Sequence, residues 1–259
     1  MLTPVCQRWR AGRDSYRPAR ETIRTADYEV ARIDTDRVAK SFVLAHHYSG
    51  TYPASRFRFG LYQRELVGVA VFAVPAQPRC LDVLPGDRMT GVVLGRFVLV
   101  DQVPANGESW FIARCFELLR DAGITGVVSF SDPARRTSAS GDVVFGGHVG
   151  TIYQATNARY LGTSKAERRW LLPDGRVLDP RALSKIRRRD QGWRYAAAQL
   201  EAFGARPLRK QEPRAWLDRW LERLCRPLRH PGNHKYAWAL QRRDRRHLPA
   251  SLPYPKVVG

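Results

Sequence analysis

The spacing of hydrophobic and polar positions changes along the chain, and each change predicts a different element. Apolar residues between positions 39 and 46 recur at helical spacing, which predicts a helix that begins near Thr35 or Asp36. Residues 57–62 and 66–74 are rich in apolar and aromatic side chains, as strands are. The short polar segment between them predicts that the two strands form a hairpin.

The central part of the chain continues with alternating strand and helix patterns. Residues 92–100 predict a strand, and apolar positions spaced three and four apart predict a helix that ends at Gly123. A second strand over 124–130 and a helix that carries Tyr153 follow. This order of helix, hairpin, strand, helix, strand and helix predicts an α/β (α+β) fold with a mixed sheet flanked by helices.

The two ends of the chain have different patterns from this centre. Residues 1–34 are rich in arginine and show little periodicity, so we expect an N-terminal arm. Residues 35–182 are expected to form the core, which would carry any catalytic site. Residues 183–259 are expected to form a basic extension packed on the core, with one helix near 193–200, a second from Pro213 to near Pro227, and a strand over 235–241.

Composition restricts the class of protein. The 259 residues are 44% hydrophobic, which suffices for one large domain or one domain with an appendage. No apolar run approaches the roughly 20 residues of a membrane span, and the first ten residues lack a secretory signal. We therefore expect a cytoplasmic protein without a membrane partner. The four cysteines form no close pair, which predicts reduced thiols and no cysteine-based zinc site.

Charge indicates the kind of partner. The net charge is +20, with 27 Lys and Arg against 11 Asp and Glu in residues 131–259 alone. Such an excess favours binding to a polyanion, most simply double-stranded DNA. The alternative is that the basic residues only make the surface highly soluble. The candidate nucleic-acid-binding residues are clustered arginines: Arg187, Arg188, Arg189, Arg242 and Arg243.

Polar side chains are dense between residues 132 and 157. Asp132 ends a predicted buried strand, where α/β folds usually place chemistry, as a base or orienting group or else as a turn-forming residue. His148 follows glycine, so it is a candidate base, metal ligand or helix cap. Gln154 and Asn157 are spaced i, i+3, so on one helix they could read the edge of a base or simply cap the helix.

Two segments of this region resemble the Mom family, bacteriophage proteins that alter adenine in DNA so that host restriction enzymes fail to cut. They are Ser-Phe-Ser-Asp-Pro at 129–133 and Gly-His-Val-Gly-Thr-Ile-Tyr-Gln-Ala-Thr-Asn at 147–157. The element order over roughly 41–181 also resembles the GNAT family of N-acetyltransferases, in which donor and acceptor meet where two central strands separate. Residues 134–146 lengthen the loop between the two segments, and this loop could contact DNA or gate access.

The resemblance implies roles for further side chains. Tyr153 lies where acetyltransferase-like enzymes often use a tyrosine to protonate the leaving group, although it could also be a core aromatic. His47 and Tyr48 resemble an element of the Mom family that could stack on the acceptor base or bind a metal. Other candidates are aromatic or polar residues of the predicted sheet and its neighbourhood: Ser129 as a catalytic residue, and Tyr52, Tyr62, Arg96 and Tyr160 as substrate-binding residues.

The donor site is expected where the second helix begins. Asn106, Glu108 and Ser109 fit the Mom pattern there, but the glycine spacing of a coenzyme A pyrophosphate turn is missing. The donor is therefore either acyl-CoA or a glycyl ester such as glycyl-tRNA, with tRNA then a second partner. An iron-dependent route, with His47, Asp132 and Tyr153 as ligands, competes, although no two-histidine, one-carboxylate set is evident.

The resemblance implies a transferase that converts adenine N6 in DNA to N6-carbamoylmethyladenine, encoded by a phage or prophage and acting in the bacterial host. Two alternatives remain from the residues alone. One is a conventional acetyltransferase that uses acyl-CoA, and the other is a DNA-binding anti-restriction protein without catalysis.

Overall fold

The computed structural model describes residues 5–18 and 20–256, and the chain divides into two compact units. The first unit comprises residues 1–133, 148–164 and 233–259, and the second comprises 134–147 and 165–232. This division differs from the expected boundaries after 34 and 182. The chain leaves the first unit twice and returns to it, because strands near residues 160 and 236 complete its sheet. Within the described residues, no helix is long and apolar enough to cross a membrane.

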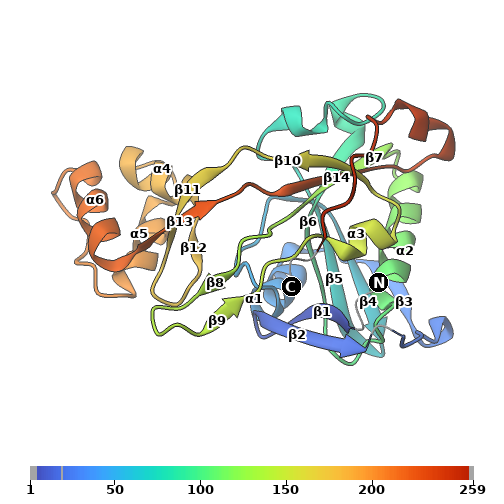
Figure 1. The fold of residues 1–259 in the computed structure, drawn as a ribbon, viewed down its shortest axis with the longest axis horizontal. Coiled ribbons are helices and arrows are strands. Elements are labelled where there is room, and N and C mark those ends of the chain that lie inside the picture. Colours follow the sequence, from blue (N-terminus) through green and yellow to red (C-terminus); the bar gives the residue numbers. More distant parts are fainter. Residues whose placement is uncertain (1–4, 19, 257–259) are drawn as a thin grey trace. The chain divides into compact units, whose positions relative to one another are not determined.

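The first unit contains a seven-stranded sheet in the order β10-β14-β7-β6-β5-β4-β3 (Figure 1). Its strands are β3 (Glu29–Arg32), β4 (Ser55–Gln63), β5 (Glu65–Ala73), β6 (Gly91–Leu99), β7 (Gly126–Ser131), β10 (Arg159–Thr163) and β14 (His234–Ala239). The β6–β7 pair is parallel and the other neighbours are antiparallel. The predicted mixed α/β sheet is confirmed.

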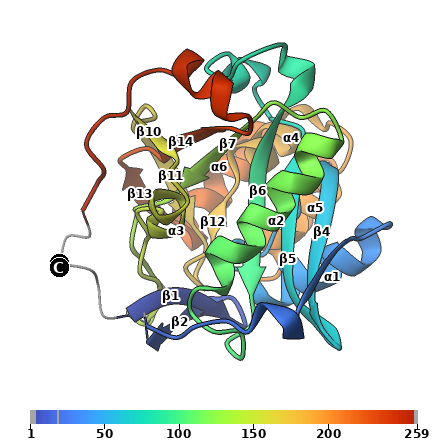
Figure 2. The same cartoon turned by 90° about the vertical axis from the view of Figure 1, so that its right-hand side faces the viewer.

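Helices cover both faces of this sheet. They are α1 (Asp36–His46), α2 (Gly107–Asp121) and the short α3 (Thr151–Ala155), with 3-10 turns η1 (Thr25–Asp27), η2 (Pro78–Leu81), η3 (Arg88–Thr90) and η4 (Arg242–His247). Ala70 and Phe72 pack with α2, whereas Val69 and Val71 pack with α1. Since alternate strand residues point to opposite faces, α1 and α2 lie on opposite sides. Figure 2 shows α2 running along its face.

The N-terminal arm is a hairpin rather than a loose extension. Strands β1 (Val5–Arg10) and β2 (Arg13–Pro18) pair antiparallel along their whole length. Ala11 and Gly12 connect them with φ angles of 49° and 75°. Positive φ at both central residues is the requirement of a two-residue type I′ turn, which suits the twist of a hairpin.

The second unit has a core and a sheet of its own. Its strands are β8 (Arg136–Thr137), β9 (Val143–Phe145), β11 (Glu167–Leu171), β12 (Val177–Leu178) and β13 (Arg226–His230), and its helices are α4 (Pro180–Arg188), α5 (Trp193–Glu201) and α6 (Pro213–Leu224). The three helices pack around Ile186, Leu200 and Leu217, which are fully buried. Residues 134–146, expected as a loop beside the active site, supply β8 and β9 to this unit.

Candidate active site

The site begins where two neighbouring strands of the first unit separate. The parallel pairing of β6 and β7 ends at Leu94 and Ser129. Beyond that point β6 stays paired with β5 as far as Leu99, and β7 stays paired with β14 as far as Ser131. A separation of two central strands is the feature that the acetyltransferase resemblance predicts for the meeting point of donor and acceptor.

Three of the predicted residues meet at this separation. Tyr153 of α3 is almost fully buried, and burial raises the pKa of its phenol above 10. A hydrogen bond with Ser129 and the positive charge of Arg96 oppose this rise in the pKa without cancelling it. Ser129 in turn donates to the carbonyl oxygen of Leu94 at 3.0 Å. The phenol therefore stays protonated at neutral pH, which is the state that a proton donor requires.

A backbone hydrogen bond joins Asp132 and His148, although residues 134–147 between them belong to the second unit. The backbone N–H of His148 donates to the backbone carbonyl of Asp132 at 2.8 Å. Both side chains are half-buried. Asp132 follows β7 directly, three residues after Ser129, so the structure holds the two predicted polar segments together at the end of the same strand.

His47, Tyr48 and His148 form one aromatic cluster. The rings of His47 and Tyr48 are stacked with centroids 4.3 Å apart, and Tyr48 meets His148 edge-on at 5.8 Å. The Tyr48 hydroxyl lies 3.4 Å from Nε2 of His148. The backbone N–H of Ser49 donates to Nδ1 of His47 at 3.1 Å, so the neutral His47 ring carries its proton on Nε2.

The loop that carries this cluster is fixed to the separating strand. The Arg96 guanidinium donates to the backbone carbonyl of Thr51 at 2.8 Å and also to the Thr51 hydroxyl. Arg96 is one of the predicted substrate-binding residues. Its hydrogen bonds instead connect β6 to the segment that follows α1, so its contacts indicate a positioning function as well as an electrostatic effect on Tyr153.

The predicted donor residues at the start of α2 have partners within the protein. The Asn106 side-chain oxygen accepts from the backbone N–H of Ile23 at 2.6 Å, and Ser109 donates to the carbonyl of Asn106. Glu108 is buried and forms an ion pair with Arg8. Burial raises the pKa of Glu108, and the Arg8 charge opposes this shift. These contacts provide no support for binding of a donor by the three side chains.

Two predicted substrate-binding tyrosines lie away from the cluster. The Tyr52 hydroxyl donates to Asp36 at 2.8 Å, at the end of α1 opposite to His47. Burial and this carboxylate raise the Tyr52 pKa to about 12. Tyr62 lies in β4, three strands from β7, beside Glu29 of the edge strand. Their positions do not support contact with the same substrate as His47 and Tyr48.

The predicted base-reading pair on α3 does not form. This helix ends at Ala155, and Asn157 follows it in the left-handed conformation, with φ of 59°. Such a residue terminates a helix, so Asn157 does not share a helical face with Gln154. The Gln154 amide donates to the carbonyl of Val149 at 3.3 Å. The sequence argument failed because it extended a five-residue helix by two residues.

Tyr160 belongs to the core of the first unit. It is buried in β10, and its hydroxyl lies 3.0 Å from both Thr163 and Nδ1 of His234. Its ring is 5.3 Å from that of Tyr236, which also contacts Tyr153. Tyr160 therefore supports the aromatic packing under Tyr153, and these contacts give it no exposed face for a base.

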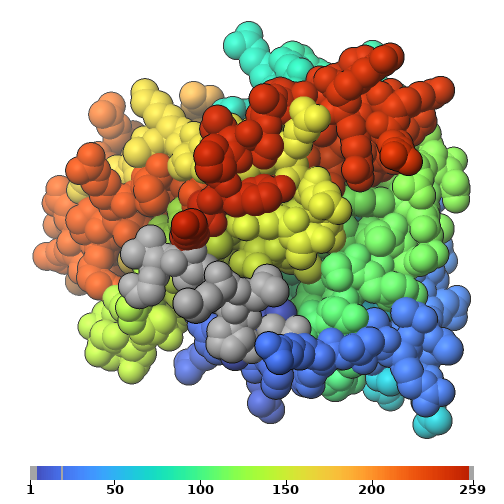
Figure 3. Space-filling model, turned by 45° about the vertical axis from the view of Figure 1, so that its right-hand side comes forward, coloured from blue at the N-terminus to red at the C-terminus, as the bar shows by residue number. Residues whose placement is uncertain are grey.

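The predicted basic clusters are at the surface of both units. Arg187 and Arg188 are exposed on α4 of the second unit. Arg189 is exposed as well, but it ends α4 and donates to the carbonyl of Arg209 at 2.8 Å. In the first unit, η4 exposes Arg242 and Arg243 (dark red in Figure 3).

A surface cavity of about 400 Å³ lies beside η4 in the first unit. Its lining residues include three arginines, Arg120, Arg242 and Arg245. Guanidinium groups gathered in this way suit phosphate oxygens. The cavity was not predicted, because Arg120 belongs to α2 and only the fold brings it to η4.

The iron centre considered from the sequence requires several metal-ligating side chains close together. Within residues 5–18 and 20–256, no group of three or more His, Cys, Asp or Glu side chains is arranged to hold a metal ion. His47 and Asp132 therefore belong to no such group, and the reaction proposed below is written without iron.

Trp9 is a member of the aromatic cluster that the sequence interpretation missed. Its ring centroid lies 4.5 Å from that of Tyr48, 5.7 Å from His148 and 6.4 Å from His47. The residue was overlooked because the N-terminal arm was expected to pack loosely. Gly12 is the signal that could have identified the hairpin, because segments of strand length lie on either side of it.

Comparisons with known proteins address the family and the fold. A tandem GNAT protein from the clavulanic acid biosynthesis pathway is similar in structure, with 12% identity, a TM-score of 0.35, and coverage of 68% of this chain and 64% of that chain. No curated protein matches the sequence. The model of the Mom protein family matches residues 27–256, most of the chain. The chain therefore belongs to the Mom family, the proteins of phage DNA modification.

Proposed function

We propose that this chain is a transferase that converts adenine N6 in DNA to N6-carbamoylmethyladenine and thereby protects the DNA from restriction. The observation that carries the proposal is the protonated Tyr153 phenol beside Ser129, at the point where β6 and β7 separate. A proton donor there suits a group-transfer reaction in which an oxygen or sulfur leaving group must be protonated. Asp132, three residues beyond Ser129 along the chain, is the proposed base for the attacking amine.

The donor that agrees best with the contacts is a glycyl ester, such as glycyl-tRNA. In acetyltransferases, helix amides at the position of the α2 N-terminus bind the pyrophosphate of coenzyme A. Here the Glu21 carboxylate accepts from the backbone N–H of Ala105 at 3.1 Å, and Glu108 occupies the first turn of α2. The Ala105 N–H is therefore already taken by a carboxylate of the protein, and the buried Arg8–Glu108 ion pair fills the first turn, so neither is available to a pyrophosphate. The same contacts disfavour the alternative of a conventional acyl-CoA-dependent acetyltransferase.

A glycyl ester yields the product without oxidation or reduction. Adenine N6 attacks the glycyl carbonyl, Asp132 accepts a proton from N6, and Tyr153 protonates the departing ribose oxygen. The free glycyl amine then attacks C6 of adenine through a five-membered ring. The bond from C6 to the original N6 breaks, and that nitrogen leaves as the carboxamide. The sum is adenine plus glycyl ester giving carbamoylmethyladenine plus alcohol, so the atoms balance.

The acceptor must leave the duplex before it can react. Adenine N6 is stacked and paired in DNA, and flipping a base out costs a few kcal/mol. Stacking on an aromatic side chain regains about 1–3 kcal/mol per base. Tyr48, half-buried beside His148, is a candidate for this contact. The exposed arginines of both units are the proposed contacts to the phosphates of the DNA and, for the glycyl donor, of tRNA.

Mass spectrometry of nucleosides provides the decisive test. DNA from cells that express the chain should contain deoxyadenosine enlarged by one carbamoylmethyl group, and DNA from cells that express Asp132→Asn should lack it. With purified protein, carbon-labelled glycyl-tRNA should transfer its label to DNA, whereas labelled acetyl-CoA should not. Resistance to restriction that disappears when protein is stripped from the DNA would instead indicate a non-catalytic binding protein. Label from acetyl-CoA would indicate a conventional acetyltransferase.

A further inference from the structure

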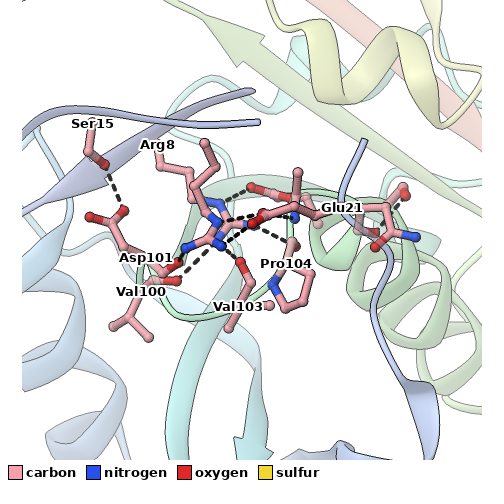
Figure 4. Close-up of polar contacts among 12 residues, drawn as sticks. Arg8, Ser15, Glu21, Val100, Asp101, Val103 and Pro104 are labelled. Carbon is pink, nitrogen blue, oxygen red and sulfur yellow. Dashed lines mark hydrogen bonds and ion pairs between the residues drawn. The ribbon is translucent and has the colours of Figure 1, made fainter. Parts of the chain in front are cut away.

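The β1–β2 hairpin lies before the region that the family model matches, which begins at residue 27. It is nevertheless fixed to the first unit through a buried arginine. Arg8 is 2% exposed, and its guanidinium donates to the carbonyl oxygens of Val100 at 3.0 Å, Pro104 at 2.8 Å and also Val103 (Figure 4). The ion pair with Glu108 completes this set. The hairpin is therefore held against the start of α2.

The opposite end of the hairpin is held by α1. The backbone N–H of Gly12, in the turn between β1 and β2, donates to the carbonyl of His46 at 3.1 Å. On β2, the Ser15 hydroxyl donates to Asp101 at 2.8 Å (Figure 4). The hairpin thus bridges the C-terminus of α1 and the N-terminus of α2, and each of these contacts is made by a specific side chain or by the turn itself.

These two attachments determine where Trp9 points. Successive residues of a strand face opposite sides, so a buried Arg8 on one side directs Trp9 to the other. There the indole packs beside Val98 and the other residues under α1, and its ring lies 4.5 Å from Tyr48 and 5.7 Å from His148. Trp9 is half-buried, a degree of burial that is compatible with contact to a ligand.

We propose that Trp9 is a base-binding residue of this enzyme and provides a stacking face for the flipped target adenine next to Tyr48 and His148. The proposal rests on the proposed function, because it assumes that the acceptor is a base removed from the duplex. A purine needs a flat apolar surface when it leaves the base stack, and tryptophan offers the largest such ring. Arg8 is then a positioning residue, since it acts on the base only by holding the strand that carries Trp9.

A duplex with one bulged 2-aminopurine tests this assignment directly. The bulged base is already outside the stack, so the assay needs neither the donor nor the target sequence. Stacking of 2-aminopurine on an aromatic ring changes its emission, and the wild-type chain should quench it. Trp9→Phe, which keeps an aromatic ring, should still quench, whereas Trp9→Leu should not. In the transfer reaction, Trp9→Leu should lower kcat/KM about 10-fold or more.

Tyr16→Leu is the matched control. Tyr16 lies on β2 of the same hairpin and is 59% exposed, so its loss should leave quenching and turnover unchanged. Quenching by a folded Trp9→Leu variant as strong as that of the wild type overturns the proposal. An equal loss of quenching in Tyr16→Leu also overturns it, because it would show that the hairpin and not the indole matters.

If Trp9→Leu does not fold, the wild-type chain labelled with 5-fluorotryptophan provides the answer. The Trp9 resonance is assigned from the spectrum of Trp9→Phe. It should shift when the bulged duplex is added and stay in place with the same duplex without the bulge, and a shift with both or with neither overturns the assignment. Because these readouts involve no transfer, they separate a failure of base binding from a failure of the proposed reaction.

Discussion

Two features of the sequence, its excess of positive charge and its Mom-like polar segments, are distributed differently between the two units. The second unit, 82 residues, has 20 Lys and Arg against 9 Asp and Glu, whereas the first unit, 177 residues, has 24 against 15. The polar segments that resemble the Mom signature lie in the first unit, at the end of β7 and in α3. The denser positive charge and the candidate chemistry therefore belong to different compact units, and evidence for one is not evidence for the other.

Arginines of this chain have two kinds of surroundings. Arg8 of the first unit is buried among carbonyl oxygens and a carboxylate, which together satisfy its donors. In the second unit Arg168, Arg194 and Arg223 lie over tryptophan rings, with centroid distances between 4.5 and 5.8 Å. A guanidinium that packs flat on a ring leaves its edge available to solvent or phosphate. Arg56 and Arg114 of the first unit also lie over aromatic rings, and Arg136 of the second unit is buried, so both kinds of arginine occur in both units.

The largest effect on the transfer rate is expected when Tyr153 of the first unit loses its phenol oxygen. Tyr153→Phe should lower the rate of transfer by about 100-fold or more, because it removes the proposed proton donor and keeps the ring. The matched control is Tyr160→Phe, another buried tyrosine, which should retain most of the rate.

The pH dependence of the rate sharpens this prediction. Because burial raises the Tyr153 pKa above 10, the phenol stays protonated, and no loss of rate from this group is expected below about pH 10. Single-turnover rates of the wild type and of Tyr153→Phe, measured across pH, test both the loss of rate in the variant and the pH dependence. A Tyr153→Phe variant with a wild-type rate would remove Tyr153 from the mechanism.

A core substitution in the second unit should separate the stability of the two units. Leu217 is fully buried between the helices of that unit, and Leu217→Ala should cost about 2–5 kcal/mol of its unfolding free energy. Hydrogen exchange should then accelerate in α4, α5 and α6 while the amides of β5 and β6 stay protected, because the hydrophobic clusters of the units are distinct. Equal acceleration in both units would mean that they unfold as one.

The smallest effect is expected from charge removal at the surface. Replacing Arg187 and Arg188 by alanine should reduce the slope of DNA affinity against salt concentration by about 2 on logarithmic axes, because each side chain is proposed to contact one phosphate. The equivalent double substitution of Arg242 and Arg243 compares the first unit in the same assay. If only the substitution of Arg242 and Arg243 changes the slope, the DNA-binding surface lies on the first unit. The denser charge of the second unit then has another purpose.

The periodic elements of the first unit were predictable from local pattern. The helix that begins at Asp36, the β4–β5 hairpin, β6, α2 and β7 all lie close to their predicted positions. In each case one face of the element is buried, so the sequence must alternate with the period of that element. The hairpin of residues 5–18 was missed because its anchor is a charged side chain, Arg8, which no hydrophobic pattern reveals.

The sequence by itself determined the family, the mixed α/β class and the polar segments that end β7 and form α3, because these depend on residues that are neighbours along the chain. Only the tertiary structure decided which side chains meet. Tyr153 joins Ser129 through a hydrogen bond across 24 positions, and Trp9 reaches His148 across 139 positions. Contacts at such separations depend on the pairing of β-strands and the burial of single polar groups, and no local period encodes either of them.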